Sequence, residues 1–187
     1  MPQANLSSVT YDPIMDALLL YLQNQLGQNG LQPIFQYMAR GAIMWPQLSQ
    51  LQNNNPIIRQ PALFLYDGVG FGGGKVKYVH QGRAQPVIRT ISRTIIIYAK
   101  APAPAGQPGG LTGGKGLLPK GGGAIFHPLV EAVETALATP DDPVRGTLTL
   151  GGLVAYCRVE GEQYLSPPDI DDNGQGMATL PVEIRIP

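Results

Sequence analysis

The stretch from residue 86 to 100, PVIRTISRTIIIYAK, constrains the fold more than any other part of the chain. It is rich in Ile, Val, Thr and Tyr, which favour an extended backbone. Alternate positions place Ile91, Ile95 and Ile97 on one face. Arg89 and Arg93 fall on that same face, nearer its start. We therefore predict a sheet strand with one end buried and the other wet or at an interface.

Other segments have the composition of strands. They are residues 61–66 (PALFLY), 75–80 (KVKYVH), 147–163 (TLTLGGLVAYCRVEGEQ) and 176–187 (GMATLPVEIRIP). Gly151 and Gly152 allow a bulge in the third of these. Pro181 cannot donate a ladder hydrogen bond, so that face of the last strand is predicted to lie at an edge or a bulge.

Two segments have helical periodicity. In the first, Asp12 suits the N-cap, Pro13 the first helical position and Gly27 the position after the end, and apolar residues recur between them at three- and four-residue spacing. The second is HPLVEAVETAL, with Pro128 at its start and His127 as a possible cap. Residues 31–45 are predicted to form a short helix or turn followed by a loop.

The order of these elements predicts one α+β domain, with an antiparallel or mixed β-sheet and two main helices packed on one face. Residues 1–10 form an N-terminal arm and residues 11–187 the domain. Within it, residues 101–123 form a Gly/Pro-rich inserted loop.

Charge and cysteine content exclude some classes of binding site. The formal net charge is zero and only 14% of residues are charged, so no long-range field attracts nucleic acid or an anionic membrane. Little self-repulsion opposes packing of copies against each other. One cysteine excludes an internal disulfide framework and a cysteine-based metal site. No signal peptide or membrane span is recognisable, so we expect a soluble protein assembled in a reducing cytoplasm.

Two glycine-rich stretches resemble nucleotide-binding motifs. GGLTGGKG, Gly109 to Gly116, gives most of a phosphate loop, but Gly116 stands where Ser or Thr should follow Lys115, and no strand–loop–helix frame surrounds it. GVGFGG, residues 68–73, matches the dinucleotide pattern but precedes a strand rather than a helix. Both are interpreted as flexible loops.

The remaining chemical candidates favour no enzyme. His80 and His127 lack acidic neighbours at ligand spacing, and Cys157 alternates within a strand as core residues do. The acidic run Asp169, Asp171 and Asp172 lacks the spacing of a calcium loop and is interpreted as a solvated turn. We therefore predict no catalytic residues, no metal and no cofactor.

Basic residues gather in the middle third of the chain. They are Arg83, Arg89, Arg93, Lys100, Lys115 and Lys120. A solvated face is one interpretation. The other is a patch facing DNA or a partner, with Arg83, Arg89, Arg93 and Lys100 at a lumen or between rings. The inserted loop is interpreted as an assembly loop, with Gly109, Lys115, Leu117, Leu118 and Lys120 as its contact residues.

The ordered segments resemble those of tail terminator (tail completion) proteins of long-tailed bacteriophages. They are TYDPIMDALLLYL, Trp45, QPALFLYDG, RTIIIYA, HPLVEAVETAL, LTLGGLVAYCRVEGE and GMATLPVEIRIP, and they run from Tyr11 to Pro187. None is a catalytic motif. The inserted loop is longer and richer in glycine than the resemblance leads one to expect, and His127 stands where Asn is more usual.

The resemblance implies a structural virion protein of the tail or neck. Such a subunit forms a ring, typically a hexamer, that caps the tail tube, ends its polymerisation and joins it to the head connector or stopper. DNA passes through the lumen without sequence recognition. Alternatives are a head-side stopper or other neck ring, a tail tube subunit and, more remotely, an NTP-binding protein using Lys115.

Overall fold

The computed structural model describes residues 11–41, 61–66, 76–79, 88–100, 123–162, 164–166 and 175–186. In chain order, the elements of this part are α1 (Tyr11–Leu26), β1 (Tyr37–Arg40), β2 (Ala62–Tyr66), β3 (Val76–Val79), β4 (Ile88–Lys100), α3 (Gly123–Ala138), β5 (Tyr156–Val159), β6 (Tyr164–Ser166) and β7 (Gln175–Ile186). A mixed sheet with two helices confirms the predicted α+β class.

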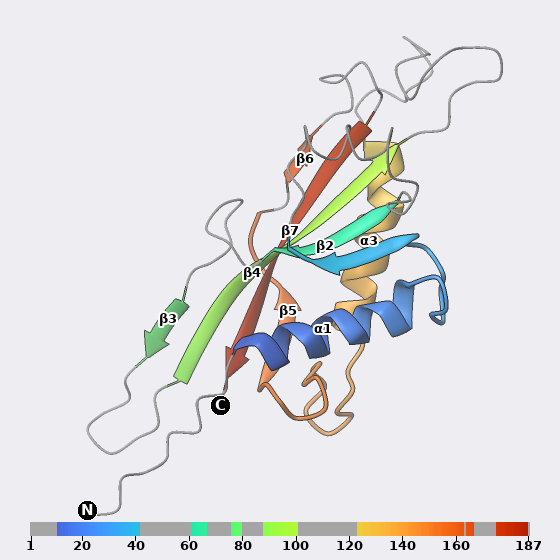
Figure 1. The fold of residues 1–187 in the computed structure, drawn as a ribbon. Coiled ribbons are helices and arrows are strands. Elements are labelled where there is room, and N and C mark those ends of the chain that lie inside the picture. The colour runs from blue at the N-terminus through green and yellow to red at the C-terminus, as the bar shows by residue number, and fades with distance from the viewer. Residues whose placement is uncertain are drawn as a thin grey trace, which may run out of the picture.

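The two long strands β4 and β7 form the spine of the sheet. They pair antiparallel along their whole length, from Arg89 opposite Ile186 to Lys100 opposite Gln175. Each carries two short strands on its outer side: β2 and β3 pair with β4, and β5 and β6 pair with β7. Figure 1 shows this pair running through the length of the molecule. The sheet order is β1-β2-β4-β7-β5, with β3 and β6 off this path.

On the outer edge of each spine strand, a gap near the middle separates the two short partner strands. On β7, pairing with β6 ends at Thr179 and pairing with β5 begins at Val182, so Pro181 lies in the break. The Pro181 carbonyl accepts a hydrogen bond from the amide of Glu160 at 3.0 Å, which shows that this side of Pro181 faces the break. Pro181 therefore lies at a short unpaired edge within the sheet. Because no strand pairs with β7 on this side of Pro181, its missing N–H removes no ladder hydrogen bond.

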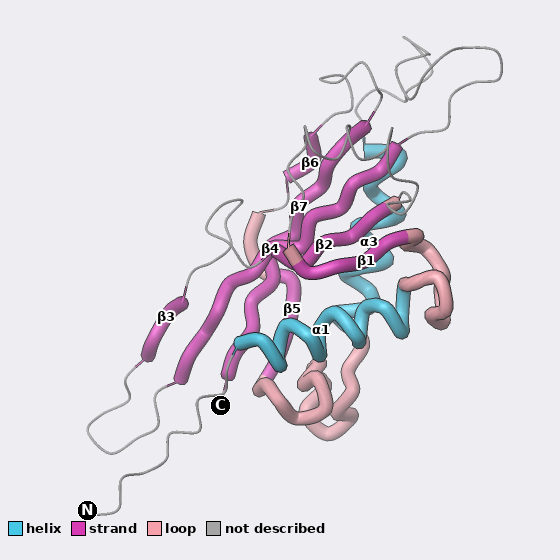
Figure 2. The backbone as a smooth tube through the Cα atoms, in the orientation of Figure 1, coloured by secondary structure: helices cyan, strands magenta, loops and turns pink. Residues whose placement is uncertain are grey.

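Both helices pack on one face of the sheet, as predicted. The core cluster joins apolar side chains of α1 and α3 to those of β2, β4, β5 and β7 that point to this face. Ile14, Leu18 and Leu22 repeat along α1, and each is fully buried. This spacing is why the sequence pattern identified the helix. Figure 2 shows the two helices and the loop from α3 to β5, which lies beside α1.

The opposite face of the sheet carries a second buried cluster. It consists of Ala62, Phe64, Ile96 and Tyr98. The Phe64 ring lies 5.7 Å from the rings of both Tyr37 and Tyr98. Burial raises the pKa of Tyr98 to about 12, so its hydroxyl stays protonated at neutral pH.

The ends of α1 differ slightly from the prediction. The helix begins at Tyr11, so Asp12 and Pro13 are its second and third residues rather than its cap and first position. It ends at Leu26, as predicted. A Cβ on Gly27 would lie 2.6 Å from the Gln23 carbonyl oxygen, so glycine is needed there because the chain passes close to the helix.

Three local predictions are wrong. Residues 37–40 form β1, not a helix or loop, because the chain pairs in parallel with β2. Helix α3 begins at Gly123, so Pro128 lies inside it, His127 is not its cap, and Gly123 is not part of the inserted loop. Among the described residues 147–162, β5 is the one strand, and Gly151 and Gly152 lie in a turn rather than a bulge. In the described part of the chain, neither helix is long and apolar enough to cross a membrane.

Candidate functional site

The sequence-predicted site residues are only partly within the described part of the chain. Outside it lie Gly109, Lys115, Leu117, Leu118 and Lys120 of the assembly loop, Arg83 and His80, the run Asp169, Asp171 and Asp172, and both glycine-rich motifs. Lys100 is the last residue of β4. His127 is exposed on α3. These positions do not form a described cluster.

The two arginines of β4 lie in different surroundings. Arg89 is partly exposed near the start of the strand. Arg93 is only 7% exposed, and its Nη1 donates a hydrogen bond to the Ser92 carbonyl at 3.0 Å. This end of the strand was predicted to be wet or at an interface, and the first alternative is wrong at Arg93 because burial on this face extends past it to Ile91. Arg93 has little surface to offer DNA in the isolated subunit.

Cys157 is a core residue, as its position in a strand predicted. It is 2% exposed, and burial raises the pKa of its thiol to about 12. A thiol with such a pKa is not a nucleophile at neutral pH. Among the described residues, no group of three His, Cys, Asp or Glu side chains is close enough to hold a metal ion.

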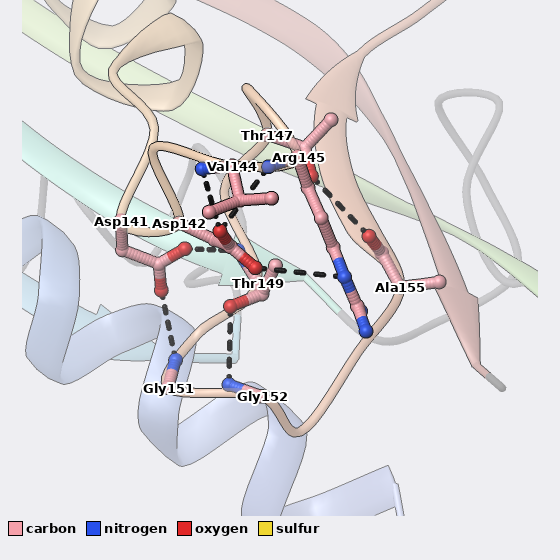
Figure 3. Close-up of polar contacts among 9 residues, drawn as sticks. All are labelled: Asp141, Asp142, Val144, Arg145, Thr147, Thr149, Gly151, Gly152 and Ala155. Atoms are coloured by element: carbon pink, nitrogen blue, oxygen red, sulfur yellow. Dashed lines mark hydrogen bonds and ion pairs between the residues drawn. The ribbon is translucent and has the colours of Figure 1, made fainter.

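A connected set of polar contacts is centred on Asp141, in the loop between α3 and β5 (Figure 3). One carboxylate oxygen accepts the amide of Thr149 at 2.5 Å and the other accepts the amide of Gly151 at 2.8 Å. Leu150 lies between these two amides. Its backbone is left-handed, with a φ of 52°, and the residue is only 7% exposed. The carboxylate thus fixes both sides of a strained residue.

Neighbouring groups complete this loop. The Oδ1 of Asp142 accepts the amides of Val144 at 2.9 Å and Arg145 at 3.1 Å, which closes a tight turn. The Thr149 hydroxyl oxygen accepts the amide of Gly152 at 3.1 Å. Every one of these bonds lies within the loop, and Val144 stands at its tip with 93% of its surface exposed.

The electrostatics of Asp141 follow from these contacts. Burial alone would raise the pKa of its carboxyl, but the amides of Gly151 and Thr149 stabilise the carboxylate, and the pKa is lowered overall. Burial also raises the pKa of Tyr21, with a further rise from the charge of Asp141. The Tyr21 hydroxyl donates to the Ala136 carbonyl at 2.8 Å, which ties α1 to the end of α3.

A second polar arrangement lies on β5 and β7. The Tyr156 hydroxyl donates to Glu183 at 2.5 Å, and the guanidinium groups of Arg158 and Arg185 lie over its ring, 4.6 and 6.0 Å from the ring centre. Arg158 also forms an ion pair with Glu160. Carboxylates balance the arginines here, so this surface has no excess positive charge for nucleic acid.

None of these arrangements places a nucleophile beside a base. Both serve to fix local structure: one holds a loop, the other ties β5 to β7. Sequence reasoning missed the role of Asp141. The sequence feature that could have indicated this role is the acidic pair in TPDDPVRG, followed after a short strand-like segment by Gly151 and Gly152. The loop requires glycine at both positions, because their φ values are 70° and 89°.

Comparison with known proteins gives no assignment. No family model matches the chain. No curated protein matches it either.

Proposed function

We propose that the chain is a structural virion protein that forms a ring, with a hexamer as the expected form, at the end of a phage tail tube. The ring ends tube polymerisation and joins the tail to the head connector or stopper. DNA passes through its lumen without sequence-specific contacts. In this proposal the subunit has no active site, and its working surfaces are those that meet other subunits.

The observation that carries the proposal is the order of the matching segments. TYDPIMDALLLYL falls mostly on α1, QPALFLYDG on β2, RTIIIYA on β4, HPLVEAVETAL on α3 and GMATLPVEIRIP on β7. LTLGGLVAYCRVEGE spans the Asp141-linked loop and β5. The resemblance therefore covers both spine strands, both helices and the loop before β5 of an α+β domain, which supports a common framework.

The character of the described surface is compatible with many protein contacts. Charges on β5 and β7 are paired within the subunit, and Val144 and Leu31 are apolar side chains exposed by 93% and 79%. Single exposed apolar residues are common on any protein, so they support the proposal only together with the segment order. Of the arginines predicted at the lumen, Arg89 is the described one with accessible surface.

The decisive experiment is loss of the protein from the phage that encodes it. If the protein ends tube growth, particles lacking it carry overlong tails or tails without heads, and supply of the protein in trans restores normal tails. Negative-stain images measure tail length and the fraction of joined particles. Tails of normal length on normal heads would refute the proposal.

Images of the purified protein separate the alternatives. Closed rings fit a terminator or a neck ring, whereas long tubes identify a tube subunit. The position of labelled protein in the particle then separates terminator from head-side stopper. For the NTP-binding alternative, calorimetry with ATP and Mg²⁺ is the test: tight binding that Lys115→Ala abolishes would replace the structural proposal.

A further inference from the structure

The sheet face opposite the helices carries a buried cluster that neither described helix covers. Its members are Ala62, Phe64, Ile96 and Tyr98, and none is more than 2% exposed. The side chains packed against them come from β1, β2 and β7, which are strands of the same sheet. Strands alone leave the face of a sheet open to water, so burial this complete requires a second layer. Both α1 and α3 pack on the other face.

The connection from β1 to β2 is long enough to supply this layer. The two strands pair in parallel, so the chain has to return from the end of β1 to the start of β2 across one face of the sheet. Such a crossover takes at least about 10–12 residues. Residues 42–60 lie between the described ends of the two strands. Both strands border the cluster, because Phe64 belongs to β2 and its ring lies beside that of Tyr37 in β1.

Handedness decides which face the connection crosses. Parallel strands of one sheet are joined by right-handed crossovers in about 98% of cases. β4 and β5 both pair antiparallel with β7, so they are parallel to each other, and α3 joins them across the face that carries the helices. Seen from that face with β4 pointing up, the rule places β7 and β5 to the right of β4, and therefore β2 and β1 to its left. β1 and β2 point down in this view, and a right-handed connection from β1 to β2 then passes behind the sheet, over the cluster.

We propose that residues 43–58 cross the face opposite the helices and cover the cluster around Phe64. The segment contains no charged residue, as expected of a layer packed on a core. Its large apolar side chains include Ile43, Trp45, Leu48, Leu51 and Ile58. Trp45 is the largest of them, and the rings of Phe64 and Tyr98 offer it aromatic partners.

The cover belongs to the same chain as the cluster. A single copy already buries these side chains, so neither a second copy nor another protein is needed to cover them. The connection that handedness directs to this face begins and ends beside the cluster. The layer closes this part of the sheet to other proteins, so the subunit contacts of the proposed ring have to use other surfaces.

Tryptophan fluorescence tests the contact directly, because Trp45 is the only tryptophan of the chain. In the folded full-length protein, its emission should lie at shorter wavelength than in urea, and acrylamide should quench it less. Ile96→Ala and Ile97→Ala form a matched pair, because both residues are fully buried in β4 and point to opposite faces. Ile96→Ala should shift the emission to longer wavelength and increase quenching, whereas Ile97→Ala should change neither. The milder Ile→Val variants at both positions replace any alanine variant that does not fold.

Three results would overturn the inference. Native emission equal to that in urea would show that Trp45 is in water. A response to Ile97→Ala but not to Ile96→Ala would place the segment on the helix face. Emission that shifts to longer wavelength on dilution, as a dimer dissociates in sedimentation, would assign the cover to a second copy.

Replacement of the segment provides a second measurement. A Gly/Ser linker of equal length in place of residues 43–58 should expose the cluster, so the protein should bind an apolar dye such as ANS and associate with itself. The same replacement of residues 101–116 is the control, because Leu111 is the only large apolar side chain there. Dye binding no greater than that of the control would contradict the proposed cover.

Discussion

Asp141 accepts hydrogen bonds from the two amides that flank Leu150, which are those of Thr149 and Gly151. Leu150 is held with a φ of 52°, a conformation that costs an L-residue roughly 1–2 kcal/mol. Its side chain is buried, so the strain is offset by packing and by the carboxylate. The relationship links an exposed loop to the core of the domain, and it makes this loop the most testable part of the structure.

Replacing Asp141 with Asn should destabilise the fold by about 1–3 kcal/mol, because the amide offers one acceptor where the carboxylate offers two. The free energy of unfolding in urea measures the loss. Asp16→Asn is the control, because Asp16 forms only an exposed ion pair with Arg40. A loss no larger than that of the control would show that the loop does not depend on Asp141.

Leu150→Gly should be more stable than Leu150→Ala by about 1 kcal/mol. Both variants remove the buried side chain, but only alanine keeps the penalty for a left-handed backbone. Denaturation of the two proteins side by side isolates the backbone contribution. The usual order, with alanine more stable than glycine, would mean that residue 150 is not left-handed in solution.

Acid should weaken the fold in a way that depends on Asp141. The pKa of this carboxyl is lower in the folded chain than in the unfolded one, so the unfolded state binds more protons between the two values. The stabilisation is complete above the unfolded value of about 4 and is lost as the pH falls through the folded value. Urea unfolding from pH 6 to pH 2 should show a shallower loss for Asp141→Asn than for the native protein, and parallel curves would contradict the assignment.

Gly161 and Pro181 should be energetically coupled. A Cβ at Gly161 would lie 2.9 Å from Cγ of Pro181, and φ there is 122°, so Gly161→Ala meets both a clash and backbone strain. Pro181→Ala alone should be nearly neutral, because the side of Pro181 that faces the gap between β5 and β6 along β7 has few hydrogen bonds to gain. In the double variant the contact with Cγ of Pro181 is removed and the backbone strain at residue 161 stays. The coupling free energy between the two substitutions should therefore be about 0.5–3 kcal/mol. Strict additivity would exclude the contact.

Periodic patterns predicted the long strands and α1 because an element buried on one face has apolar residues at regular intervals in the sequence. The alternation along β4 and β7 and the three-four spacing along α1 each reflect one apolar face. β1 was missed because YMAR has no such regular spacing of apolar residues. It is a strand because it pairs in parallel with β2. The start of α3 was missed because its first residue, Gly123, follows other glycines, a composition typical of loops.

The candidate site was less predictable for a related reason. Arg93 lies between Ile91 and Ile95 on one face, so its burial could have been inferred, but the charge favoured a wet position. The bonds of Asp141 to Thr149 and Gly151 depend on the path of a loop, and no local rule gives that path. The proposed assembly contacts involve other copies, which a single chain does not contain.

The spine of two long strands has a consequence for how the protein is made. The edge of β4 opposite β2 and β3 gains its partner only after β7 has left the ribosome, and residues 101–174 are synthesised between the two strands. During that interval a long, Ile-rich strand exposes one unpaired edge, which is a hazard for aggregation in a crowded cell. Completion of the sheet is therefore a late event in biosynthesis, and a nascent chain halted before β7 should be a substrate for chaperones rather than a partly folded subunit.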